Sequence, residues 1–151
     1  MKVTSSYAVE VKGIDKHFRT IRKIYQDALS YCIKVFDKEW DRFEDEDDFT
    51  QKSIGDSLIH TTKNHKAICD FDTKFPKMPT YMRRAVINNA IGHLKSYHSS
   101  IDNWYYDECK GNKPTLQTRL NKLPVFYKEY MYKDDQQGNA VRLKLFVQQL
   151  L

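Results

Sequence analysis

The chain has 151 residues, of which 40% are hydrophobic, enough for one domain with a real core, so a disordered tail protein is excluded. No run of 18 apolar residues occurs, and the N-terminus lacks the charged and apolar regions of a secretion signal. We therefore expect an intracellular, cytoplasmic protein that does not enter a membrane. The net charge of +5 is concentrated in residues 79–151, which hold 11 basic and 6 acidic side chains, and this excess favours an anionic partner.

The N-terminal region predicts a strand followed by a helix. Apolar and polar residues alternate over Val3–Lys12, which is typical of a half-buried strand that Gly13 ends. Asp15 is placed to cap the helix that follows. The core face of this helix is the stripe Phe18, Ile21, Tyr25, Leu29, Cys32, Phe36, Trp40 and Phe43. Its first turns carry the cations Lys16, Arg19, Arg22 and Lys23. They oppose the helix dipole, so they either bind phosphate or lie in solvent.

The middle of the chain contains an acidic run and a second, shorter helix. The run Glu44–Asp48 could hold Mg²⁺, but five consecutive acids cannot all face one ion, so we interpret it as a solvated linker. A helix is expected from Asp48 to about Asn64, weakened by Gly55. Its inward residues are expected to be Phe49, Ile54, Leu58 and Thr61 or Thr62.

No catalytic or metal site is indicated by the sequence. The histidine pairs are five residues apart, not four as metal-binding helical pairs are, and the three cysteines show no C-x-x-C spacing. Phosphate-binding loops and nucleophile elbows are also absent. We therefore expect no catalytic residue, no bound metal and no cofactor.

The most strongly patterned segment is a long helix. Pro76 and Pro79 prevent helix before about residue 79, and Thr80 is a possible N-cap. The expected helix is roughly 28 residues long, and Gly111 and Pro114 stop it. One face is apolar, with Ile87, Ala90, Ile91, Leu94, His98, Ile101 and Trp104 or Tyr105. The other face and the first turns carry groups that can bond phosphates or base edges, namely Arg83, Arg84, Asn88 and Lys95.

After Pro114 the pattern changes to short extended pieces. Val125–Met131 and Ala140–Val147 predict a hairpin, which we expect to pair with the first strand in a small sheet or open barrel. Basic and aromatic residues interleave over Lys110–Lys133, as on a surface that binds phosphates and stacks bases. A solvated basic face with core tyrosines is the alternative. The predicted fold class is α+β, a helical bundle inserted into a small β-barrel or sheet that need not be complete.

Three segments resemble a known family: SYAVEVKG, FDTKFPKMPTYMRRAVINNAIG and WYYDECKGNKPTLQTRLNKLPVFYKEYMY. They are similar to the N-terminal part of TnpB-type proteins, the transposon-encoded OrfB "transposases" of clostridial type. These are compact RNA-guided DNA nucleases related to type V CRISPR effectors. The resemblance reaches about Lys144, and its most specific part is the segment KPTLQ (residues 113–117) after the long helix.

The resemblance implies a two-part organisation. Residues 1–13 and 111–151 would form a truncated wedge domain, an oligonucleotide-binding-like barrel, and residues 14–110 a helical recognition domain. In the family these domains hold guide RNA and the RNA:DNA heteroduplex and read a short DNA motif. The residues implied to approach that motif are Tyr81, Arg83, Arg84, Asn88 and Asn89. Those implied to face RNA or heteroduplex backbone are Lys110, Lys113, Gln117, Arg119, Lys122, Tyr127 and Lys128.

The family's RuvC-like nuclease domain and zinc ribbon have no counterpart in this sequence, so we expect no DNA cleavage and no enzyme. The first hypothesis is a nucleic-acid-binding module for structured guide-type RNA and for target DNA, in the bacterial cytoplasm or on the nucleoid. The second is a helical protein-interaction or structural module. A degenerate transposase fragment without activity is a third.

Overall fold

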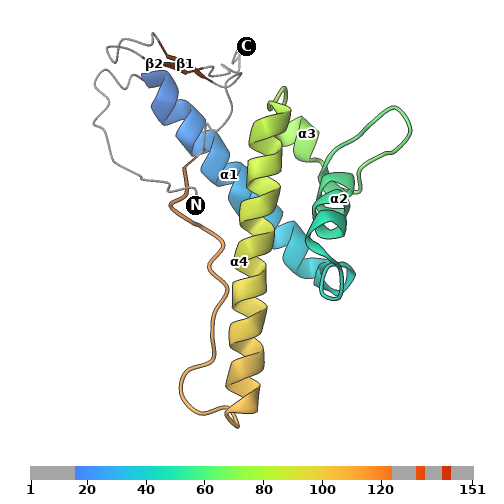
Figure 1. Ribbon diagram of the computed structural model, residues 1–151, viewed down its shortest axis with the longest axis vertical. Helices are drawn as coiled ribbons and strands as arrows, with labels where there is room; N and C mark the ends of the chain where they lie inside the picture. Colours follow the sequence, from blue (N-terminus) through green and yellow to red (C-terminus); the bar gives the residue numbers. More distant parts are fainter. Residues whose placement is uncertain (1–15, 124–131, 135–140, 144–151) are drawn as a thin grey trace, which may run out of the picture.

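The computed structural model describes residues 16–123, 132–134 and 141–143, and the regular structure in this part of the chain is mainly helical (Figure 1). In chain order its elements are α1 (Lys16–Lys38), the 3₁₀ turn η1 (Trp40–Arg42), α2 (Asp48–Ile59), α3 (Phe71–Lys74), α4 (Thr80–Tyr106), β1 (Tyr132–Asp134) and β2 (Val141–Leu143).

The core lies where α4 crosses α1 (Figure 1). Apolar residues at three- and four-residue spacing form one buried stripe on each helix. On α1 and the turn after it, the buried stripe is Ile21, Tyr25, Ala28, Leu29, Cys32, Ile33, Phe36, Trp40 and Phe43. On α4 it is Met82, Val86, Ile87, Ala90, Ile91 and Leu94. The predicted core face of the first helix is thus confirmed, apart from Phe18, which is only half-buried.

The two halves of α4 differ in burial. Within α4 no residue after Leu94 is buried, and Ile101 and Trp104 are only half-buried. Figure 1 shows the C-terminal end of α4 projecting beyond α1 and α2, with residues 107–123 running back beside it. We call residues 107–123 the return segment. Two of its side chains, Leu116 and Leu120, pack against the core.

Helix α2 packs against both α1 and α4 at Gly55. A Cβ atom on Gly55 would lie 2.8 Å from Cγ2 of Ile87 and 3.2 Å from Cζ of Phe36. These distances are shorter than normal carbon contacts, so only glycine lets α2 approach so closely. The sequence pattern suggested that Gly55 weakens the helix; its larger effect is to fix where α2 sits.

The inward face of α2 was predicted only in part: Leu58 is buried and Ile54 packs against the core, as expected. The buried residues are Gln51, Gly55, Leu58 and Ile59. Phe49 was expected in the core, but its side chain is 83% exposed. Gln51 and Gly55 are four residues apart and share the face that packs on α1 and α4. Phe49 is two residues from Gln51, about 200° around the helix, so it points outward. The helix also ends earlier than predicted, and Thr61 and Thr62 are exposed.

The acidic run is not only a linker, because its last two residues make specific contacts. Asp47 is the N-cap of α2, with Oδ1 accepting from the backbone N–H of Phe49 at 2.8 Å and of Thr50 at 3.1 Å. Its Oδ2 accepts from the Thr50 hydroxyl at 2.8 Å. Asp48 forms an ion pair with Lys95 of α4. The run therefore starts α2 and ties it to α4.

The predicted α+β fold with a β-barrel is wrong. Among the described residues, the one sheet is the antiparallel pairing of β1 with β2, in which Tyr132 pairs with Leu143. The return segment is extended but joins no sheet, because its apolar side chains pack on the helices instead. The expected strand Val3–Lys12 and most of the expected hairpin lie outside the described residues.

None of the described helices combines the length and the apolar character that a membrane span requires.

We expect alanine substitution of two helical glycines, Gly55 and Gly92, to change the free energy of unfolding in opposite directions. Gly55→Ala should lower the free energy of unfolding by about 1–3 kcal/mol, because the new methyl meets Ile87 and Phe36. Gly92→Ala should raise it by about 0.5–1 kcal/mol, because nothing lies within 4 Å of the added Cβ and alanine favours helix. Urea unfolding followed by circular dichroism measures both. Equal effects would contradict the close packing of α2.

We also expect part of the acid sensitivity to come from Asp47. Hydrogen bonds from the Thr50 backbone N–H, the Thr50 hydroxyl and the Phe49 N–H hold the pKa of Asp47 below its usual value. The stability it contributes is therefore complete above the unfolded pKa of about 3.9 and is lost as pH falls through the lower folded pKa.

The matched variant is Asp47→Asn, which keeps a capping oxygen but does not titrate. Between about pH 6 and about pH 2.5, its melting temperature should fall less than that of the wild type. If the melting temperatures of the two proteins fall equally with pH, the Asp47 cap does not contribute to the pH dependence of stability.

Candidate nucleic-acid interface

A groove runs between α2 and α4 on the surface of the helical core. It consists of two adjoining hollows, of about 380 Å³ and about 320 Å³, which share Lys52 and Asn88. The first is lined by Phe49, Lys52, Ser53, Asp56, Arg84, Ile87 and Asn88. The second is lined by Asp48, Gln51, Lys52, Asn88, Ile91, Gly92 and Lys95. We call these two hollows together the α2–α4 groove.

The polar side chains from α4 follow one edge of this groove. Arg84, Asn88 and Lys95 are four and seven residues apart, so they lie on one face of the helix over about 16 Å of its length. All three were proposed from the sequence as groups that bond phosphates or bases. The structure brings them together in one concave surface.

Charge in the α2–α4 groove is only partly compensated. Asp48 pairs with Lys95 at 2.6 Å, and this contact holds the pKa of Asp48 below its usual value. Asp56 pairs with Arg83. Lys52 and Arg84 make no ion pair or hydrogen bond within the described part of the chain. The groove therefore presents two cations that an anionic group could neutralise.

Helix α2 adds three groups to the groove that the sequence analysis missed. Phe49, Lys52 and Ser53 stand at spacings of three and four, which places them on one helix face. This spacing was visible in the sequence, but Phe49 was assigned to the core. Its 83% exposed ring instead lies beside the cations Lys52 and Arg84. An exposed aromatic ring can stack on a base, and cations beside it can neutralise the phosphate of the same nucleotide.

One buried polar atom at the groove lacks a partner. Gln51 lines the second hollow and is only 2% exposed. Its Nε2 donates to the carbonyl of Phe43 at 2.5 Å, whereas its Oε1 has no hydrogen-bond partner. Exchanging the two amide atoms would set two oxygens against each other, so the unpaired atom is the oxygen. A buried acceptor without a donor costs about 1–3 kcal/mol.

Three residues predicted at the start of α4 serve the fold instead. Arg83 is 8% exposed, and its Nε donates to Oδ1 of Asp56 at 2.9 Å. Asn89 donates from Nδ2 to the hydroxyl of Tyr25 at 2.6 Å. Tyr81 is half-buried, and this burial raises its pKa. The neighbouring Arg84 and Asn88 are the members of the set that stay exposed.

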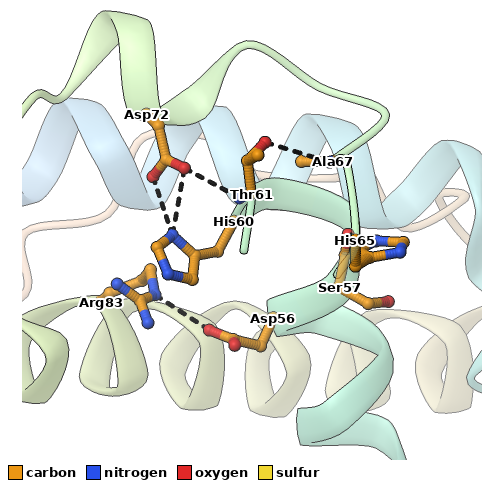
Figure 2. Close-up of polar contacts among 8 residues, drawn as sticks. All are labelled: Asp56, Ser57, His60, Thr61, His65, Ala67, Asp72 and Arg83. Carbon is orange, nitrogen blue, oxygen red and sulfur yellow. Dashed lines mark hydrogen bonds and ion pairs between the residues drawn. The ribbon is translucent and has the colours of Figure 1, made fainter. Parts of the chain in front are cut away.

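The loop after α2 is held by a second set of polar contacts, drawn in Figure 2 together with the Arg83–Asp56 pair. Oδ2 of Asp72 accepts from the backbone N–H of Thr61 at 2.9 Å and lies 3.0 Å from Nδ1 of His60. Thr61 in turn accepts from the Ala67 N–H. These contacts fix the end of α2, and hence one wall of the groove.

The predicted RNA-facing residues of the return segment lie elsewhere. The carbonyl of Gln117 lies 2.7 Å from Nε2 of His93, which is nine residues, or about 180°, around α4 from Arg84. The return segment therefore meets the face of α4 opposite the groove. Tyr127 and Lys128 lie outside the described residues.

The cations of the return segment have partners of their own. Arg119 pairs with Asp27 at 3.1 Å, and Lys110 with Glu108 at 3.7 Å. Lys113 lies 5.6 Å from the centre of the Trp104 ring. A hollow of about 550 Å³ beside Arg119 mixes the cations Lys34, Lys38 and Lys74 with the carboxylates of Asp27 and Asp70. With Arg119 it has four cations against two carboxylates, so it is at least as basic as the α2–α4 groove, but no exposed aromatic ring lines it.

Within the residues that the structure describes, no group of three or more histidine, cysteine or acidic side chains is placed to hold a metal ion. The cysteines are free: Cys32 is buried, and Cys109 is exposed.

The fold and groove define a small helical protein with a polar, partly basic cleft between two helices. The chain matches the model of the Aq_aa04 family over residues 4–147, and it belongs to that family. No curated protein and no solved structure matches it. The family's name states no substrate or partner.

The two neighbouring arginines of α4 should differ sharply in their effect on stability. We expect Arg83→Met to lower the free energy of unfolding by about 1–3 kcal/mol, because it breaks a partly buried, charged hydrogen bond to Asp56. Arg84→Met should change it by less than about 0.5 kcal/mol, because Arg84 is exposed. Urea unfolding compares them, and similar losses would contradict this division of roles.

Proposed function

We propose that this protein is a non-catalytic nucleic-acid-binding module that uses the α2–α4 groove to hold a polynucleotide. The observation that carries this proposal is the meeting of Lys52 and Arg84, two cations without an ion pair in the described part of the chain, with the exposed ring of Phe49 in one groove. Cations neutralise phosphates and an exposed ring stacks a base, so one surface offers both contacts that a nucleic acid requires.

Structured guide-type RNA is the first partner that we propose, and target DNA the second. The resemblance of three segments to TnpB-type nucleases supports this choice, because in that family the matching region contacts both. The Aq_aa04 family match bears on neither partner. We propose no cleavage activity, since the resemblance does not extend to the family's nuclease domain.

A protein-interaction module is the second candidate, and one observation favours it. Tyr105 is 57% and Tyr106 is 88% exposed at the projecting end of α4. Asp102, Asp107 and Glu108 outnumber the two nearby lysines there, so this end suits a protein surface better than a phosphate backbone. Size-exclusion chromatography of Tyr105→Ser/Tyr106→Ser tests whether this end joins two copies.

We expect charge reversal in the groove to weaken binding of nucleic acid. The double variant Lys52→Glu/Arg84→Glu should bind structured RNA and single-stranded DNA about 10- to 100-fold more weakly than wild type in a fluorescence-anisotropy titration. Repeating the titration over a range of salt should show a shallower dependence, by about 0.7 in slope for each lost phosphate contact on a single strand.

The matched control is Lys63→Glu/Lys66→Glu, which makes the same change in net charge on the exposed loop between α2 and α3. If this control weakens binding as much as the groove variant, the attraction is general rather than located in the groove. Arg119→Glu/Lys122→Glu tests the return segment separately. Failure of the wild type to bind any of these polynucleotides at low salt would overturn the proposal.

A further inference from the structure

We infer that the hollow between α1, α3 and the return segment binds an oligophosphate group, that is, two or more phosphates joined in a row. We call this hollow, of about 550 Å³, the α1–α3 hollow. It shares no lining residue with the α2–α4 groove, so the inference does not depend on the proposed function. Its four cations are Lys34 and Lys38 of α1, Lys74 of α3 and Arg119 of the return segment.

Two of these cations have no counter-charge. Lys34 and Lys38 are exposed and make no ion pair or hydrogen bond within the residues that the structure describes. They are four residues apart on α1, so they lie on the same side of the helix and repel each other. The thiol of Cys69 lies near Lys38, but burial and the nearby carboxylate of Asp70 raise its pKa, so it stays neutral. A bound anion would offset the repulsion between the two lysines.

The two carboxylates of the α1–α3 hollow already have partners. Oδ1 of Asp27 accepts from Nη2 of Arg119 at 3.1 Å, and Oδ1 of Asp70 accepts from the Tyr31 hydroxyl at 2.5 Å. Oδ2 of Asp70 also lies 3.8 Å from Nζ of Lys74. Four cations against two carboxylates leave an excess of two positive charges. An anion with at least two negative charges would neutralise this excess, and an oligophosphate is such an anion.

The positions of the cations favour a compact anion over a passing nucleic-acid strand. They come from three chain segments that form different walls of the α1–α3 hollow, so a group placed inside is contacted from several sides. A strand on the surface carries one charge per phosphate and meets the protein from one side. Arg119 uses one of its N–H groups on Asp27 and has others for a phosphate oxygen, and the lysine ammonium groups can rotate toward such oxygens.

The rings of the α1–α3 hollow do not favour a base. Tyr31 and Phe75 are half-buried and pack on each other, with ring centres 6.0 Å apart. Nζ of Lys74 lies 4.8 Å from the centre of the Tyr31 ring. Neither ring is exposed as Phe49 is, so the hollow offers charge without a free stacking surface. We therefore expect the phosphates of a ligand to be held and its base to contribute little.

The test uses the full chain with inorganic tripolyphosphate as the probe and sodium sulfate at equal ionic strength as the reference. Tripolyphosphate should raise the melting temperature and, in isothermal titration calorimetry, bind at least about tenfold more tightly than sulfate. ATP and CTP should bind within about threefold of tripolyphosphate, because no base is stacked. Equal affinities for tripolyphosphate and sulfate would overturn the inference. A nucleotide bound more than about tenfold more tightly than tripolyphosphate would overturn the assignment to phosphates alone.

The variant that locates the site is Lys34→Gln/Lys38→Gln, which removes two charges and keeps good helix formers. It should bind tripolyphosphate at least about tenfold more weakly than wild type. Without ligand its melting temperature should not fall, because the two lysines only repel each other, and a fall would show that they already have partners. The matched control Lys63→Gln/Lys66→Gln makes the same charge change on the loop between α2 and α3, outside the hollow. An equal loss of affinity in this control would overturn the inference.

Free nucleoside triphosphates and the 5′ end of an RNA both carry an oligophosphate, and two RNAs of one sequence distinguish these sources. They are compared in Lys52→Glu/Arg84→Glu, in which the α2–α4 groove contributes little. If the RNA end is the ligand, the RNA with a 5′-triphosphate should bind at least about tenfold more tightly than the RNA with a 5′-hydroxyl. Equal binding of both RNAs, with tripolyphosphate still bound, assigns the site to free oligophosphates.

The two proposals fail separately. If tripolyphosphate does not bind the wild type, the inference is overturned and the α2–α4 groove is unaffected. If polynucleotides do not bind at low salt but tripolyphosphate does, the proposed function is overturned and the α1–α3 hollow stands.

Discussion

The close contact at Gly55 is the constraint on which the rest of the surface depends. Because a side chain is missing there, α2 lies near enough to α1 and α4 for Gln51, Leu58 and Ile59 to enter the core. With these residues of α2 facing the core, Phe49 is on the opposite side of the helix and is exposed to solvent. A packing requirement in the interior thus decides which residues of α2 are left on the outside, and that choice creates the α2–α4 groove.

Adjacent polar residues on α4 have different roles, because their side chains point in different directions around the helix. Arg83 faces α2 and neutralises Asp56, whereas Arg84 is one step further around the helix and stays exposed. Asn88 and Asn89 repeat this division, since Asn89 bonds to Tyr25 of α1. Two of the four thus maintain the assembly of helices, and two are left for a partner.

The sequence predicted the helices better than it predicted how they pack. The stripes of the first helix and of α4 up to Leu94 were correct because a 3.6-residue period over many turns leaves little ambiguity. The predicted inward face of α2 was right at Leu58 and wrong at Phe49, because a 12-residue helix with Gly55 near its middle has a weak pattern, and close packing decides which side faces the core. Arg84, Asn88 and Lys95 were found from residue type, whereas Lys52 and Gln51 required knowledge of which helix lies opposite. The prediction of a β-barrel was wrong because the extended return segment packs on helices.

The uneven burial of α4 has a consequence for its dynamics. Up to Leu94 the helix shares a core with α1 and α2. Lys95 and His98 still contact Asp48 and Asp37, whereas the last turns project beyond these helices with the return segment beside them. Backbone amides in the first half should exchange with solvent far more slowly than those near Tyr106, because opening the first half requires disruption of the core. The groove lies against the slow half. A partner would therefore meet walls that are already ordered, and little chain entropy would be lost on association.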